Sequence, residues 1–213
     1  MKPDATPPTA ARLRGLFEAR GGYLTSREAR DHGIHAEQLA RLVALGRAER
    51  VQRGVYRLLG DATPFGAAEE LLELQLRVPY ARPCLVSALH LHGLTTTRPA
   101  ALQFAIPRHR AFPWLAEPRV EVFYFQPQAY AYGTFELAVA GRRLTTYTAE
   151  KTLADLLRYA PKLGREVYLE GLKNYLRGRP HRAGRALIEA ARAMRVEAPL
   201  RRDLEVLAHD QAH

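Results

Sequence analysis

Gln38 and Arg41 stand three residues apart, and each ends in a flat group that makes paired hydrogen bonds. A glutamine amide can bond two atoms of adenine and an arginine guanidinium two atoms of guanine, so both suit the base edges of a DNA groove. His35, just upstream, adds a ring that donates or accepts a hydrogen bond. These three residues are therefore candidates for contacts with bases.

A second set of polar residues suits contacts with phosphate. Thr25, Ser26 and Arg27 are consecutive and offer two hydroxyls and a guanidinium. At the start of a helix, such side chains and the free backbone N–H groups bind phosphate oxygens. Arg50 and Arg53 lie further along the same basic segment, where we expect them to reach the DNA backbone or the minor groove.

Two other pairs are candidates for catalysis or metal binding. His90 and His92 form a His-x-His pair, but no third ligand stands nearby and alternate residues of a helix point in different directions, so capping or packing is expected. Lys151 and Asp155 are four residues apart, which predicts a surface or half-buried ion pair rather than an acid–base couple. Phosphate-binding and nucleophile motifs are absent. The sequence therefore predicts a protein that is not an enzyme, with no catalytic residues, metal or cofactor.

Positive charge is concentrated in two segments of the 213 residues, whose formal net charge is +10. Residues 1–60 hold 11 Lys and Arg against 6 Asp and Glu, and residues 142–202 hold 15 against 6. Clustered cations indicate a polyanion partner, because neutralised phosphates release their counterions. In the second segment four arginines crowd a connection between helices, which predicts a second surface for DNA or RNA. They are Arg177, Arg179, Arg182 and Arg185. The alternative is a solvated arginine face.

Three short helices and a two-stranded ribbon are predicted to position the first two sets of residues. Hydrophobic spacing and turn signals place these elements at residues 9–20, 25–33, 36–45, 48–52 and 55–59. Burial of Leu39, Leu42 and Val43 in the third helix turns Gln38 and Arg41 outward. Three helices followed by a β-hairpin outline a winged helix-turn-helix, in which the third helix enters the major groove.

The same outline also fits a three-helix module that contacts protein and leaves its polar residues solvated. Glu37 belongs to the outward face and would repel phosphate. It must therefore face a cytosine edge, pair with Arg41, or point away. The arginines around the ribbon favour DNA over the protein-binding alternative.

The rest of the chain is predicted to form a larger mixed domain. Helices are expected at residues 67–78, 87–94, 148–157, 166–176 and 183–195, and strands at 102–106, 120–125, 134–139 and 143–147. Because strands and helices are segregated, the fold class is α+β, with a mainly antiparallel sheet and C-terminal helices. The predicted organisation is a disordered lead at 1–8, the winged helix-turn-helix at 9–60 and the larger domain at 61–213.

The cysteine content and the hydrophobic pattern bear on the compartment. Cys84 is the only cysteine and excludes an internal disulfide, and neither a leader segment nor a long apolar run is visible. We therefore expect a cytoplasmic, nucleoid-associated protein without membrane contact.

Three stretches of this sequence resemble one known family. Ser87–Leu94 (SALHLHGL) and Tyr147–Leu157 (YTAEKTLADLL) look like the carboxy-terminal domain of the AbiEi antitoxins, and Gly22–Tyr56 is similar to their winged-helix head. The likeness keeps its order and spacing over residues 10–207. It implies a transcriptional regulator linked to phage defence, which represses its own operon as the antitoxin of a type IV toxin–antitoxin system. It further implies opposition to a nucleotidyltransferase-like toxin, without a stable complex.

Two hypotheses on function follow from the sequence. The first is a DNA-binding autorepressor that reads a double-stranded operator, an inverted repeat, through residues 9–60. The alternative is a non-catalytic module that interacts with protein or RNA and does not use its winged-helix head to read an operator.

Overall fold

The computed structural model describes residues 10–60, 66–115, 117–178 and 183–210. The chain divides into two compact units, of which unit 1 comprises residues 1–79 and 137–144, and unit 2 residues 80–136 and 145–213. The predicted lead at 1–8 and the domain boundary placed at residue 61 lie outside the described residues, so both stay predictions.

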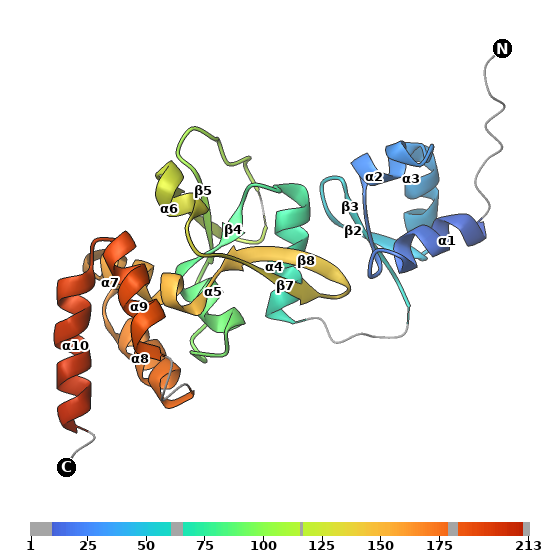
Figure 1. The fold of residues 1–213 in the computed structure, drawn as a ribbon. Coiled ribbons are helices and arrows are strands. Elements are labelled where there is room, and N and C mark those ends of the chain that lie inside the picture. The colour runs from blue at the N-terminus through green and yellow to red at the C-terminus, as the bar shows by residue number, and fades with distance from the viewer. Residues whose placement is uncertain (1–9, 61–65, 116, 179–182, 211–213) are drawn as a thin grey trace. The chain divides into compact units, whose positions relative to one another are not determined.

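Unit 1 contains the expected helices and ribbon, with one additional strand (Figure 1). Its elements are α1 (Ala10–Glu18), β1 (Tyr23–Thr25), α2 (Ser26–Asp31), α3 (Ala36–Ala44), β2 (Ala48–Gln52), β3 (Val55–Leu58) and α4 (Ala67–Arg77). β3 pairs antiparallel with β1 on one side and β2 on the other. The three helices and the ribbon are confirmed, whereas β1 was missed because three residues carry too little periodicity.

Local signals and a small core together hold the first three helices in place. Thr25 caps α2: its hydroxyl accepts from Glu28 N, and the Glu28 carboxylate accepts from Thr25 N, which completes a capping box. The apolar faces of the helices meet the sheet in one buried cluster, made of Leu13, Phe17, Leu24, Ala29, Ile34, Leu39, Leu42, Ala48 and Tyr56. Burial of Leu39 and Leu42 fixes which face of α3 is presented to solvent.

α4 is tied to the sheet of unit 1 by a buried carboxylate. Glu73 is 6% exposed, and it accepts hydrogen bonds from the Tyr23 hydroxyl (3.0 Å) and the Arg57 guanidinium (2.9 Å). Burial raises the pKa of Glu73 and, together with the neighbouring carboxylate, raises the pKa of Tyr23 to about 12, although Arg57 opposes both shifts. A helix that follows the ribbon in sequence is therefore part of the same compact unit.

Unit 2 places a small sheet beside a group of helices, which gather at the orange and red end of the chain in Figure 1. Its elements are β4 (Arg82–Pro83), α5 (Leu85–Leu91), β5 (Leu102–Pro107), β6 (Val120–Phe125), α6 (Pro127–Ala131), α7 (Ala149–Leu163), α8 (Glu166–Gly178), α9 (Ala183–Ala193) and α10 (Glu197–Asp210). A further two-stranded sheet, β7 (Thr134–Val139) with β8 (Arg142–Tyr147), has its turn in unit 1. The α+β class and the C-terminal helices are confirmed.

The sheet of unit 2 is more mixed than the sequence predicted. β4 pairs antiparallel with β5, but β5 and β6 run parallel, with Leu102 opposite Val120 and Pro107 opposite Phe125. Twelve residues connect the end of β5 to the start of β6, which lies beside the first residue of β5. A connection of about this length is needed between parallel strands. Pro107 and Pro118 therefore bound a crossover loop and not a tight turn.

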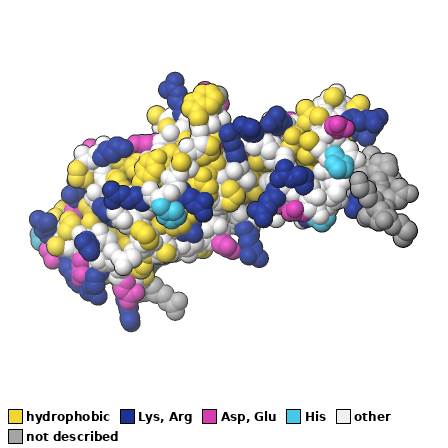
Figure 2. Space-filling model, turned by 90° about the horizontal axis from the view of Figure 1, so that it is seen from above, with side chains coloured by type: hydrophobic (Ala, Val, Ile, Leu, Met, Phe, Trp, Pro, Cys, Tyr) yellow, Lys and Arg dark blue, Asp and Glu magenta, His cyan; other side chains and the backbone are white. Residues whose placement is uncertain are grey.

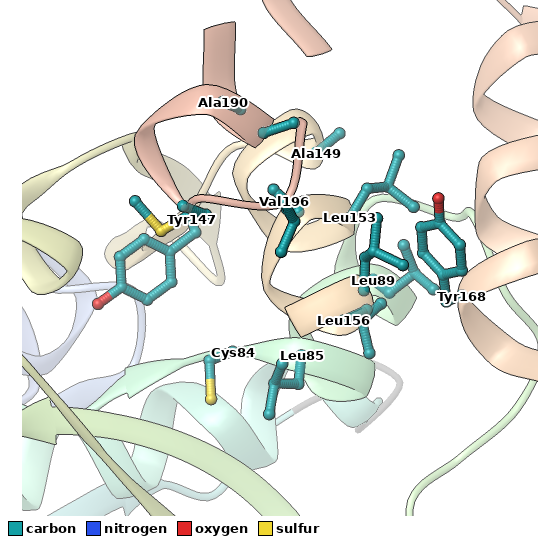
Figure 3. Packing of buried hydrophobic residues seen from close by; sticks show 14 of the residues in the cluster. Cys84, Leu85, Leu89, Tyr147, Ala149, Leu153, Leu156, Tyr168, Ala190 and Val196 are labelled. Atoms are coloured by element: carbon teal, nitrogen blue, oxygen red, sulfur yellow. The ribbon is translucent and has the colours of Figure 1, made fainter. Parts of the chain in front are cut away.

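α7 is the central helix of unit 2. It contacts α5, α8 and α9, so most of its residues from Ala149 to Leu157 are buried. Figure 3 shows Leu89 of α5, Leu153 and Leu156 of α7 and Tyr168 of α8 in one cluster. A helix covered on several sides buries its polar positions as well as its apolar ones.

Candidate nucleic-acid interface

α3 presents the polar face that its hydrophobic spacing predicts. His35, Glu37 and Arg41 are exposed, and Gln38 is half-buried. Arg41 and Glu37 form no ion pair, and neither side chain has a hydrogen-bond partner among the described residues. The Arg41 guanidinium therefore keeps its donors available, and the interpretation that Glu37 is neutralised by Arg41 is wrong for this structure.

Gln38 also caps the helix on which it lies. Its Oε1 atom accepts a hydrogen bond from the backbone N–H of His35 at 2.9 Å, as expected for glutamine at the third helical position. The amide NH₂ group has no partner among the described residues. Gln38 can donate to a base without losing its cap, but bidentate pairing with adenine requires its oxygen to accept a second hydrogen bond.

The residues predicted to meet phosphate at α2 differ in their availability. The Thr25 hydroxyl is engaged in the capping box, and Ser26 donates its backbone N–H to Gly54 O at 2.8 Å. Arg27 is exposed, and its side chain has no hydrogen-bond or ion-pair partner in the described part of the chain. Of this set, Arg27 has the side chain best placed for phosphate.

A third arginine joins Arg50 and Arg53 at the β2–β3 ribbon. Arg77, the last residue of α4, donates to Gln52 Oε1 of β2 at 3.0 Å. Partial burial lowers the pKa of Arg77, and the positive charges of Arg53 and Arg50 lower it further. The Arg77 guanidinium therefore feels the positive charges of the two ribbon residues, and we call Arg50, Arg53 and Arg77 the ribbon arginines.

Arg77 was missed by sequence reasoning for a structural reason. It stands outside the segment predicted to bind DNA, and only the docking of α4 through Glu73, one turn earlier, brings it to the ribbon. The one available signal was its position as the last cation of an amphipathic helix. On the face seen in Figure 2, Lys and Arg side chains cover more of the surface than Asp and Glu.

The predicted second basic surface is only partly described. Arg179 and Arg182 lie outside the described residues. Arg177 is exposed and donates to Asn174 Oδ1 at 3.2 Å, whereas Arg185 pairs with Glu189 at 3.0 Å. Glu189 therefore offsets part of the positive charge at this connection, and a polyanion surface here stays a prediction.

His92 and the Lys151–Asp155 pair have structural partners, whereas His90 Nδ1 is buried without a hydrogen-bond partner among the described residues. His92 is the C-cap residue of α5, and its Nε2 atom lies 2.7 Å from Tyr147 O, the position of a donor to that carbonyl. Lys151 and Asp155 form an ion pair, as expected, but both are buried, and the prediction of a surface or half-buried pair is wrong. No group of metal-ligating side chains occurs in the described residues, and no described helix is long and apolar enough to cross a membrane.

Comparison with known proteins finds a family similar to the amino-terminal segment. Residues 11–59, which run from α1 through β3, match the family model of transcriptional regulators described as AbiEi antitoxins. The family resemblance inferred from the sequence is thus confirmed over this segment, and the family is one of antitoxins that regulate transcription. None of the curated proteins matches the chain.

Chains of solved structures also match this chain. The chain is similar to the RV2827C protein from Mycobacterium tuberculosis, with a TM-score of 0.47 and 18% sequence identity over 96% of this chain and 83% of that one.

Proposed function

We propose that unit 1 is a winged helix-turn-helix that binds double-stranded DNA and represses transcription of its own operon. α3 is the recognition helix, β2 and β3 form the wing, and α2 contacts the backbone. The observation that carries the proposal is that five arginines stand on elements of one small unit: the ribbon arginines, and Arg27 and Arg41, whose side chains have no partner among the described residues. Such a concentration of guanidiniums suits phosphate and guanine.

The proposal extends to the role of the whole chain. An antitoxin that regulates transcription acts beside a toxin, and we propose a nucleotidyltransferase-like toxin, opposed without a stable complex. The reading frame next to this gene should then encode a nucleotidyltransferase. Sequencing of genomic fragments retained by the purified full chain at physiological salt should return an inverted repeat upstream of the operon. Retention without sequence preference would contradict operator reading.

Substitutions on α3 should separate base reading from helix capping. Arg41→Ala should weaken operator binding about 5- to 150-fold, which corresponds to one bidentate contact of about 1–3 kcal/mol. Gln38→Glu keeps an oxygen that can cap the helix but removes the amide donor, so stability should persist while operator selectivity falls. Gln38→Ala should lose both, with a stability cost of about 1 kcal/mol.

These variants are measured by anisotropy with an operator duplex and a scrambled duplex, together with urea unfolding. Arg14→Ala is the matched control, since Arg14 is an exposed arginine of α1, a helix outside the proposed contacts. If Gln38→Glu and Arg41→Ala both distinguish the two duplexes as well as the original chain does, α3 is not the reading helix.

Substitutions of the ribbon arginines should change affinity for every duplex. Each of Arg50→Gln, Arg53→Gln and Arg77→Gln removes one cation, so the slope of log K against log salt should become shallower by about 0.9 for each lost phosphate contact. Arg14→Gln removes the same charge from α1, where Arg14 pairs with Glu18, and should leave the slope unchanged. A slope that stays constant in all three ribbon variants would rule out phosphate contacts by the ribbon.

A further inference from the structure

The crossover loop between β5 and β6 carries an unusual combination of side chains. Arg108, His109 and Arg110 begin the loop and are exposed. Trp114, four residues after Arg110, is 83% exposed and is the only tryptophan of the chain. An exposed indole offers an aromatic face on which a base can stack.

The start of this loop is fixed by two tyrosines of unit 2. The Tyr80 hydroxyl donates to Ala111 O at 2.7 Å, and the Arg110 guanidinium lies 5.4 Å from the centre of the Tyr80 ring. The Tyr130 hydroxyl in turn donates to Tyr80 O at 2.8 Å. Trp114 is therefore presented from an anchored base, its Cα at most about 14 Å along the chain from that of Arg110.

The surroundings of the loop are positively charged. Arg82 lies under Tyr130, with its guanidinium carbon 3.9 Å from the ring centre, and donates to Tyr130 O at 2.6 Å. Burial raises the pKa of Tyr130, and the positive charges of Arg82 and Arg110 both oppose that rise. Within the described residues, no carboxylate forms an ion pair with Arg82, Arg108 or Arg110.

We propose that residues 108–114 form a binding site for single-stranded nucleic acid, in which Trp114 stacks on a base while Arg108 and Arg110 contact phosphates. An exposed aromatic ring within a few residues of cations that form no ion pair among the described residues is a combination by which proteins hold single strands. A duplex offers no free base face to such a ring, since its bases are already stacked. The site lies in unit 2 and goes beyond the duplex binding proposed for unit 1.

The single tryptophan provides a direct test with the full chain. Titration with twelve-residue oligo(U) or oligo(dT) should lower the tryptophan emission to a plateau, because a stacked base quenches the indole. Heparin, a polyanion without bases, should displace the oligonucleotides without lowering the emission itself. Tighter binding of oligo(U) or of oligo(dT) identifies RNA or DNA as the strand that the site prefers.

Variants assign the binding to the loop. With labelled oligonucleotide followed by anisotropy, Trp114→Ala should weaken binding about 5- to 150-fold and Trp114→Phe much less, as expected for loss of one stacked base. Arg108→Gln and Arg110→Gln should each reduce the salt slope by about 0.7. The double variant Arg41→Gln/Arg53→Gln should lose operator binding and keep the quenching, so that failure of one proposal is distinct from failure of the other.

Three results would overturn the proposal. The first is an emission that single strands leave unchanged, and the second is full affinity in Trp114→Ala. The third is a response to polyglutamate in the absence of any response to oligonucleotides, which would assign the loop to an acidic protein partner.

Discussion

Replacing either member of the Lys151–Asp155 pair alone should lower the free energy of unfolding by about 3–5 kcal/mol. The side chains of Lys151 and Asp155 are 0% and 1% exposed, so Asp155→Asn or Lys151→Met leaves a charge without its counter-charge in the core of unit 2. A stranded buried charge costs far more than the pair itself contributes.

The surroundings explain why each charge depends on the other. The Lys151 ammonium nitrogen lies 4.7 Å from the ring centre of Phe125 and 4.8 Å from that of Tyr147. Burial raises the pKa of Asp155 and lowers the pKa of Lys151, while their mutual attraction opposes both shifts. The second oxygen of Asp155, Oδ1, is buried without a hydrogen-bond partner among the described residues. Lys151 is therefore the main compensation for the buried carboxylate.

Urea unfolding of the single and double variants measures this dependence. Lys151→Met/Asp155→Leu should recover most of the loss, because two apolar side chains of similar size can replace a buried pair. Arg185→Ala provides the control: Arg185 and Glu189 have the same spacing on α9 but are exposed, and the change should cost less than about 1 kcal/mol. If Asp155→Asn and Lys151→Met each lower the free energy of unfolding as little as Arg185→Ala does, the two buried charges do not depend on each other for stability.

The same pair shows how far a sequence pattern predicts structure. The four-residue spacing predicts the contact between Lys151 and Asp155, because it is a local property of a helix. Their burial depends on α5, α8 and α9 packing around α7, and those contacts join segments far apart in the sequence. From its sequence α7 looks amphipathic, because polar residues occur at regular positions. Their burial becomes apparent only when the packing of α5, α8 and α9 around α7 is known.

The candidate interface divides in the same way. Hydrophobic spacing predicts the exposed face of α3. The capping role of Gln38 could also have been predicted from the sequence, since glutamine at the third helical position is a known capping signal. The position of Arg77 at the ribbon could not be predicted from the sequence, because it depends on the docking of α4 through the buried Glu73. The place of Trp114 was not predicted for a related reason. β5 and β6 pair in parallel, so a crossover loop and not a tight turn joins them, and local sequence does not show this pairing.

Gly21→Ala should destabilise unit 1 by about 2–5 kcal/mol, and Gly22→Ala by only about 1–2 kcal/mol. Both glycines have positive φ, +63° and +83°, so both substitutions carry the cost of a left-handed backbone. A methyl group at position 22 meets open space. At position 21 it would lie 1.6 Å from the carbonyl oxygen of Ala140, in the turn between β7 and β8.

Displacement of that turn would have a second consequence within unit 1. Arg142, two residues after Ala140, donates to Glu28 at 2.8 Å, and Glu28 closes the capping box of α2. Burial raises the pKa of Glu28, but the hydrogen bonds from Thr25 and Arg142 outweigh it, and the net pKa is lowered. A turn forced away from Gly21 would remove Arg142 and leave Glu28 with only part of this compensation.

Thermal and urea unfolding of the two glycine variants therefore isolates the contact with the turn. The left-handed backbone cost is common to both, so the difference between them reports the displaced Ala140 and Arg142. Arg142→Ala in the Gly22→Ala background should lose stability, whereas in the Gly21→Ala background it should change little, because the contact is already broken. Equal losses for Gly21→Ala and Gly22→Ala would mean that the turn moves aside without cost and that α2 does not depend on it.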